Sequence, residues 1–432
     1  GPIVKHKAFF FLSYDGQRNT IPNEINLQQN LGSVQVPPDP ASQSGYATLQ
    51  SKAGSWERGQ NQDVFLARAD WQIDAKHRLT LRYNHQNFTG VNFENGGATN
   101  AEEHTGDSLV RTRTLNASLA SVFSSTFFNE FRVQWARDQE PGEANSANPE
   151  ATVRQGGRTV LTIGRNFFSP RETTIKRFQL ADTITLVRGQ HQWKAGADVN
   201  LDDILNYFPG NFSGAYTFSS LASFDGGRPS NAAAGERYVQ AFAGAGTTGP
   251  TTEPNIKEFA AFVQDEWKVR RDLTLTFGLR YDLQSFAQPT VQNPDPQLAA
   301  AGIDTSFLKT DKNNFAPRVG FAWNPQDKLV VRGGYGLFYG RTPSIMVGTA
   351  HSNNGINVQT VTFTGALVPT YPATLPSLPT GVTLPKPTIF VFDKDSQTLE
   401  LGQLPSRELL DKLADVGYKE REHSPYVGEA ES

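Results

Sequence analysis

Three observations predict that this 432-residue sequence forms an all-β fold, an antiparallel barrel that crosses a membrane. Apolar and polar residues alternate over segments of about ten residues or more, the length of a tilted membrane-crossing strand. Short turns and long polar loops alternate between these segments. Trp and Tyr gather near the segment ends. The competing interpretation is a soluble sandwich, but sandwich strands are usually shorter and core aromatics need not sort to strand ends.

The alternation is clearest in two segments. From Leu273 to Leu283 every second residue is Leu, Phe or Tyr, and from Trp193 to Leu201 every second residue is Trp, Ala, Val or Leu. Further strands are predicted at 7–14, 63–73, 78–88, 111–123, 127–137, 177–187, 257–268, 315–323 and 329–340. This makes eleven strands, or twelve if 358–364 is included.

The lengths of the connections predict which end of the barrel is periplasmic and which is extracellular. Short turns are expected at 74–77, 124–126, 188–190, 269–271 and 324–328, and long loops rich in Gly, Asn, Ser and Pro at 15–62, 89–110, 138–176, 202–256 and 285–314. Loops that long argue against a compact soluble domain. Their alternation with short turns is typical of barrels with short periplasmic turns and long extracellular loops. The polar faces of the strands would then point into the lumen: Arg280, Asp282, Lys194, Asp198, Glu130 and Arg132.

Aromatic residues predict two membrane-interface girdles. One lies beside the short turns and contains Trp71, Trp193, Trp267 and Trp323. The other lies near the long-loop ends and contains Trp135, Tyr83, Tyr281 and Tyr339. These positions match the aromatic belts of membrane barrels.

Composition excludes several classes of protein. Without cysteine there is no disulfide, thiol nucleophile or Cys-based zinc site. A formal net charge of -3 gives no basic surface for nucleic acid. No segment approaches the ~18 apolar residues of a membrane-spanning helix. Because the sequence opens at Gly1 and its one Met is Met346, we expect a fragment or a processed piece.

Several motifs resemble those of one family. The segments 1–18, 259–282, 314–325 and 331–340 are similar to segments of Oar-like TonB-dependent transporters, which are large outer-membrane barrels. The pair of strands within 259–282 is characteristic of TonB-dependent barrels in general, and its combination with 1–18 points to the Oar-like branch. The resemblance covers about residues 1–394.

The resemblance implies a receptor and transporter of the bacterial outer membrane. Such a protein binds an extracellular ligand with its loops and passes it through the lumen, while a plug domain and the TonB–ExbB–ExbD complex supply gating and energy. Family members have about 22 strands around a plugged lumen. The chain therefore corresponds to roughly half a wall, without the plug and the TonB-contacting segment, surrounded by outer-membrane lipid.

The last part of the sequence departs from this pattern. Residues 395–432 are rich in charge, and Leu409, Leu410, Leu413 and Val416 have helical spacing, with Ser406 and Gly417 as plausible caps. We expect residues 1–394 to form the partial barrel and 395–432 a charged, partly helical tail. The tail arises either from a frameshift, fusion or truncation, or as a partner-binding segment. Pro-rich 369–387 is expected to be extended.

No motif predicts catalysis, a cofactor or a resident metal. The seven histidines have no metal-ligand spacing. The acidic runs Glu102-Glu103-His104 and Asp202-Asp203 could serve calcium or carboxylate chemistry, but solvated loop charges are the simpler interpretation. Gly333-Gly334-Tyr335-Gly336 lacks the helix that follows a phosphate-binding loop, so these glycines are expected to relieve crowding in the lumen or mark a bend.

Two other functions remain open at this stage. The barrel could be a surface adhesin without energised transport, or the chain could be an extracellular β-rich enzyme acting on polysaccharide. The ligand itself is not readable from the sequence. The loop 206–212, with Tyr207, Phe208 and Phe212, could stack on sugars or peptides.

Overall fold

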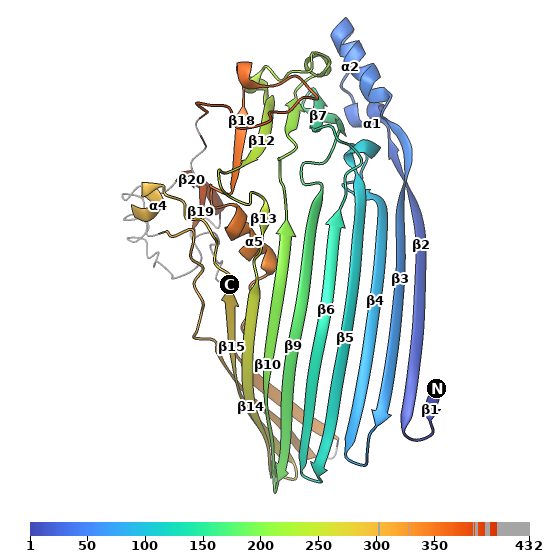
Figure 1. Ribbon diagram of the computed structural model, residues 1–432, viewed down its shortest axis with the longest axis vertical. Coiled ribbons are helices and arrows are strands. Elements are labelled where there is room, and N and C mark those ends of the chain that lie inside the picture. The colour runs from blue at the N-terminus through green and yellow to red at the C-terminus, as the bar shows by residue number, and fades with distance from the viewer. Residues whose placement is uncertain (301–302, 327, 383, 385–387, 394–397, 404–432) are drawn as a thin grey trace.

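A computed structural model describes residues 1–300, 303–326, 328–382, 384, 388–393 and 398–403. Its main feature is a tall, curved antiparallel sheet, the wall (Figure 1). Consecutive strands of the wall are neighbours, as in a meander. The eleven long strands are β2 (Ala8–Ile25), β3 (Gly54–Gln72), β4 (His77–Glu94), β5 (Gly106–Ser124), β6 (Phe127–Gly142), β9 (Arg171–Arg188), β10 (His191–Tyr207), β14 (Ile256–Arg270), β15 (Leu273–Phe286), β16 (Phe315–Gln326) and β17 (Leu329–Gly336).

These eleven strands are the predicted ones, and most of them are longer than the sequence pattern indicated. β2 extends to Ile25 and β3 begins at Gly54, so the first long loop is shorter than expected. β17 ends at Gly336, before the predicted limit of 340. Two short strands, β1 (Pro2–Val4) and β13 (Thr251–Thr252), complete the sheet. The sheet is not closed: within the described part of the chain, β17 does not pair with β1 or β2.

Pairing register assigns a different chemistry to each face of the wall. Trp193, Val199 and Leu201 lie opposite Leu186, Leu180 and Phe178, on a face where large apolar side chains are exposed. Lys194 and Asp198 belong to the other face, where Gln179 donates a hydrogen bond to Asp198 at 2.8 Å. An apolar outer face and a polar inner face are what a lipid-exposed barrel wall requires.

The long loops form a second, compact unit at one end of the wall, which we call the loop module (Figure 1). Its five-stranded sheet has the order β18 (Val358–Phe363), β12 (Arg237–Ala243), β11 (Ala215–Phe218), β7 (Glu150–Gln155) and β8 (Arg158–Ile163), with β7 and β11 parallel. The expectation that 358–364 might be a twelfth wall strand is therefore wrong. β18 pairs with β12 because its alternate residues, such as Val361 and Phe363, fill the core of the loop module.

Short helices cover this second sheet: α1 (Leu27–Leu31), α2 (Pro40–Gln50) and α3 (Leu221–Asp225). α2 begins where Asp39 accepts a hydrogen bond from the Ser42 amide at 2.9 Å, with Pro40 in the first turn. It buries Gly45 and Leu49, and the Gly45 backbone approaches the Leu221 carbonyl so closely that a side chain there would collide with it. The helix pattern of α2 escaped the sequence prediction because it is short and mostly polar.

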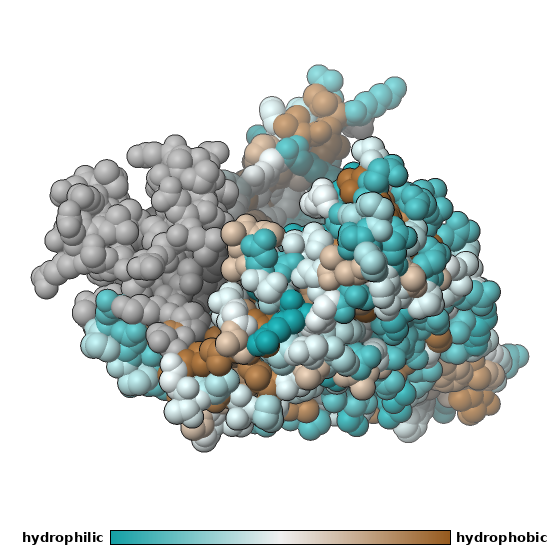
Figure 2. Space-filling view, turned by 90° about the horizontal axis from the view of Figure 1, so that it is seen from above, coloured by the Kyte–Doolittle hydropathy of each residue, from teal (hydrophilic) through white to brown (hydrophobic). Residues whose placement is uncertain are grey.

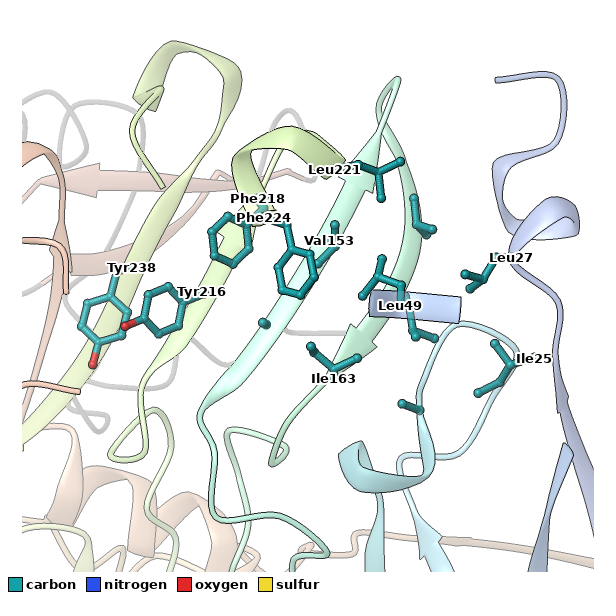
Figure 3. Close-up of a cluster of buried hydrophobic side chains, with 14 of the residues drawn as sticks. Ile25, Leu27, Leu49, Val153, Ile163, Tyr216, Phe218, Leu221, Phe224 and Tyr238 are labelled. Atoms are coloured by element: carbon teal, nitrogen blue, oxygen red, sulfur yellow. The ribbon is translucent and has the colours of Figure 1, made fainter. Parts of the chain in front are cut away.

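The core of the loop module is a continuous hydrophobic cluster (Figure 3). Tyr216, Phe218 and Leu161 are almost fully buried, and Leu49 and Leu221 reach them from α2 and α3. Because this part lies beyond the apolar band of the wall, burial of these side chains from water stabilises it as in a soluble domain.

The remaining elements are small. They are α4 (Pro296–Ala300), α5 (Ser344–Ser352), the 3-10 turns η1 (Glu102–His104), η2 (Ala232–Ala234) and η3 (Gly365–Leu367), and the strand pair β19 (Thr388–Asp393) and β20 (Thr398–Gln403). A minor core joins Val347 and Ala350 of α5 to Ile204, Ile256 and Leu308. Among the described helices none is long and apolar enough to cross a membrane. The predicted helix after Ser406 lies outside the described residues.

We expect Phe218→Ala to loosen the loop module and leave the wall intact. Removing a fully buried Phe typically costs about 3–5 kcal/mol. Hydrogen–deuterium exchange should show faster exchange in β7, β11 and β12, with no change in β9 and β10. Phe178→Ala, on the exposed outer face, is the matched control, and an equal effect of both substitutions would contradict the assignment.

Candidate ligand-binding site

The inner face of the wall carries a charged network just below the loop module. Arg177 of β9 donates two hydrogen bonds to Asp202 of β10, at 2.7 and 2.9 Å. Glu258 of β14 accepts from Asn200 at 2.9 Å and from Gln284 at 3.2 Å. These side chains meet because their positions are paired across adjacent strands. The result is a polar, hydrogen-bonded lining at the loop end of the lumen face.

Above this lining, three aromatic rings form an exposed cluster. The Phe167 and Phe168 ring centroids are 3.9 Å apart, and Phe168 stacks on Phe208 at 4.8 Å. Phe168 and Phe208 remain 37% and 39% exposed. The loops stay together because the Asn211 amide donates to the Phe167 carbonyl at 2.9 Å. Exposed rings of this kind can stack on an apolar or sugar-like group, and Phe208 is part of the loop that the sequence singled out.

A buried polar group joins η1 to β7 inside the loop module. His104 Nδ1 lies 3.1 Å from the Gly164 carbonyl, and its Nε2 lies 4.0 Å from the Glu150 carboxylate. Glu150 also accepts from the Phe167 amide at 3.1 Å, so this group holds the aromatic cluster in place. Burial raises the pKa of Glu150 to about 7 and lowers the pKa of His104 to about 4. The pair is therefore neutral near pH 6, and Glu150 gave no sequence signal because it resembles any loop carboxylate.

The acidic runs have structural partners. Glu103 forms a salt bridge with Lys52 at 2.7 Å and accepts from the Gly164 amide at 3.1 Å. Asp202 is paired with Arg177, and Asp203 with Lys176 at 3.4 Å on the opposite face. Glu103 and Asp202 are therefore paired within the protein rather than solvated as expected, and Asp203 remains exposed.

The residues of the two predicted girdles lie largely on one face of the wall. Trp193 lies opposite Leu186, Trp267 opposite Leu275, and Trp135 opposite Phe178. By register Trp71, Tyr83, Tyr281 and Trp323 belong to the same outer face. Tyr339 follows the end of β17 and is outside the strand. Contact of these residues with a membrane interface stays a prediction.

Gly333 and one histidine differ from expectation, whereas Gly336 leaves room for the Arg318 side chain on the inner face, as expected. In β17, Gly333 makes room for Phe321 on the outer face rather than relieving crowding in the lumen, since a Cβ there would lie 2.6 Å from the Phe321 ring. His191, expected to be an ordinary solvated residue, hydrogen-bonds Asp265 at 2.7 Å and stacks between Trp193 and Trp267. Trp193 and Trp267 therefore cover a polar pair on the outer face.

Comparison with known proteins identifies the family. The family model described as an outer membrane beta barrel domain matches residues 17–404. The chain belongs to this family. It is accordingly an outer-membrane β-barrel protein of a bacterium, and the wall belongs to its barrel domain. No curated protein matches the sequence.

Solved outer-membrane barrels are similar to the chain at low identity. The outer membrane transporter YddB from Escherichia coli is 15% identical, with a TM-score of 0.49 over 82% of this chain and 38% of that one. The FrpB iron transporter from Neisseria meningitidis is 14% identical, with a TM-score of 0.47 over 81% and 45%. The siderophore receptor PirA from Acinetobacter baumannii is 11% identical, with a TM-score of 0.42 over 78% and 39%. The chain spans less than half the length of each of these barrels.

We expect the stability of the loop module to change little between pH 4.5 and 6.5, because two titrations oppose each other. Glu150, with its raised folded pKa, binds more protons when folded, so its contribution falls as pH rises toward 7. His104, with its lowered folded pKa, binds fewer protons when folded, so its contribution rises between pH 4 and 6.5.

Glu150→Gln should expose the His104 titration. The loop module should then gain about 2–3 kcal/mol between pH 4 and 6.5. Hydrogen exchange of β7 and β8 measured across this pH range, and corrected for intrinsic exchange, tests the prediction. In His104→Gln the stability of the loop module should instead fall as pH rises. Stability that does not change with pH in either variant would contradict the two pKa shifts.

Proposed function

We propose that the chain is part of an outer-membrane receptor or transporter of the Oar-like, TonB-dependent type. In this proposal the loop module captures an extracellular ligand, which passes along the polar inner face of the wall. The barrel domain comprises residues 1–394, and residues 395–432 lie outside this domain, although β20 still pairs with β19. The TonB–ExbB–ExbD complex supplies energy through segments of a longer protein, and the chain has no enzymatic role.

One observation carries this proposal: the exposed Phe168–Phe208 pair lies on a folded loop module beside a polar lumen face. Phe208 follows β10 directly, and Asn200 and Asp202 of the same strand belong to the charged lining. A ligand held by the rings would therefore be at the entrance to the polar face. Ligand sites of this kind combine aromatic contact area with a few placed polar groups.

The buried core of the loop module supports capture rather than a passive loop. The Phe167 amide donates to Glu150, and the Phe168 amide donates to Asn166, whose side chain lies 3.4 Å from His104 Nε2. Rings that are already ordered lose less conformational entropy when a ligand binds. The rest of the module surface at the loop end is mainly hydrophilic, with separate apolar patches (Figure 2).

Site-specific photo-crosslinking tests this function in cells. A photoreactive phenylalanine at position 208 should capture a small ligand from the medium, seen as a defined mass increase of the purified protein. The same residue at Phe259, on the exposed outer face of β14, is the control and should capture lipid only. Phe168→Ala should weaken ligand capture at position 208 about tenfold, because it removes both stacking and apolar contact.

Dependence on TonB distinguishes a transporter from an adhesin. In cells lacking TonB, a transporter should still be crosslinked to its ligand at position 208 but should no longer accumulate that ligand inside the cell. Crosslinks to surface proteins of other cells, without a small ligand, would favour the adhesin. Capture of a glycan together with its cleavage products would favour the enzyme.

A further inference from the structure

A row of cationic side chains crosses the outer surface of the wall at the loop end. Arg113 of β5 is directly opposite Arg137 of β6, and Arg137 is directly opposite Lys176 of β9. Arg111, two residues before Arg113, extends the group toward the loops. We call these four residues the cationic row. Like charges directly opposite on a sheet repel each other, so this arrangement favours a bound anion.

The cationic row lies at the border of the apolar outer face. The next residues on the same face, two positions along each strand toward the short turns, are Leu115, Trp135 and Phe178. Leu115, Trp135 and Phe178 are 42–49% exposed, as expected for side chains that face lipid. Two residues along a strand span about 7 Å, so the guanidinium groups lie just beyond the apolar band. In an outer-membrane barrel this is the level of the outer-leaflet headgroups.

Within the described part of the chain, three of the four cations lack an acidic partner. Lys176 is paired with Asp203, at 3.4 Å. Among the residues that the structure describes, Arg111, Arg113 and Arg137 form no salt bridge, and Arg137 Nε is buried without a hydrogen-bond partner. The nearby acid Asp138 is on the inner face, where Thr112 donates a hydrogen bond to it at 2.7 Å.

A surface hollow of about 310 Å³ adjoins the cationic row. Arg137, Lys176 and Thr174 line it, together with the acids Glu172, Asp203 and Glu253. The acids come from β9, β10 and the segment before β14, whereas Arg111 and Arg113 are on β5, at the other side of Arg137. An anion is therefore favoured at the β5–β6 side of the hollow, away from the acids.

We propose that Arg111, Arg113 and Arg137 bind the phosphate group of an anionic lipid headgroup in the outer leaflet. Arg suits this role because its planar fork donates two parallel hydrogen bonds to phosphate. The acyl chains would lie below, against Leu115, Trp135 and Phe178. Such a site would fix the height of the wall in the membrane and is independent of the ligand captured by the loops.

The test is a lipid titration of the complete 432-residue chain in neutral detergent, followed by native mass spectrometry. The probes are a diphosphorylated lipid A, its dephosphorylated form and inorganic phosphate. We expect binding of the phosphorylated lipid and much weaker binding of the other two. Arg113→Gln with Arg137→Gln should weaken this binding about tenfold or more, since each cation near anionic lipid contributes about fivefold.

Two control proteins make the result decisive. Arg132→Gln changes an arginine of the same strand β6 that belongs to the inner face, and it should leave lipid binding unchanged. Arg113→Lys with Arg137→Lys keeps both charges and should retain part of the binding. This result would exclude misfolding as the cause of the weaker binding in the Gln variant. Unchanged binding by the Gln variant, an equal loss in Arg132→Gln, or equal affinity for inorganic phosphate would overturn the proposal.

Discussion

The complete pairing of backbone hydrogen-bonding groups is the constraint on which this structure depends. In lipid an unpaired amide or carbonyl costs several kcal/mol, so a strand can cross only as part of a continuous sheet. Nine of the eleven long strands, β3 to β16 of the wall, satisfy this constraint by pairing on both sides, whereas, apart from the short β1, β2 and β17 lie at the edges of the described sheet. Register then follows, because a shift by one residue would move every apolar side chain of a strand, such as Trp193 or Leu201, to the polar face.

Two different solvents stabilise the two parts of the chain. The wall exposes most of its apolar residues on the outer face and places charged pairs such as Arg177 and Asp202 on the inner face. The loop module does the reverse and buries Tyr216, Phe218 and Leu161 in a core of its own. This core lets the loops present a fixed surface, because Glu150 and His104 connect it to the Phe167–Phe168 segment.

Charged side chains on the outer face mark the boundary between the wall and the loop module. On the outer face, the apolar pairs end at Leu115, Trp135 and Phe178, and charged pairs begin two residues closer to the loops. On the inner face no such boundary exists among the described strands, since charges such as Arg68, Asp70 and Arg280 occur along its length. The contrast fits a wall with lipid on one side and water or protein on the other.

The sequence by itself determined the wall and its two faces. A period of two carries both strand and face information, so 273–283 and 191–201 were readable residue by residue. The alternation of loop lengths likewise indicated the end at which the long loops gather. The loop 206–212, which contains Phe208, could be proposed as a contact segment because it is rich in aromatic and Asn residues.

Only the tertiary structure decided what the loops do. β7, β8, β11, β12 and β18 are short and come from separate loops, so their pairing is non-local and leaves no periodic signal. The partnership of Phe168 with Phe208, the burial of Glu150 beside His104 and the alignment of Arg113 with Arg137 have the same origin. Each depends on cross-strand register or on contact between distant segments, and single-sequence patterns record only what neighbouring residues share.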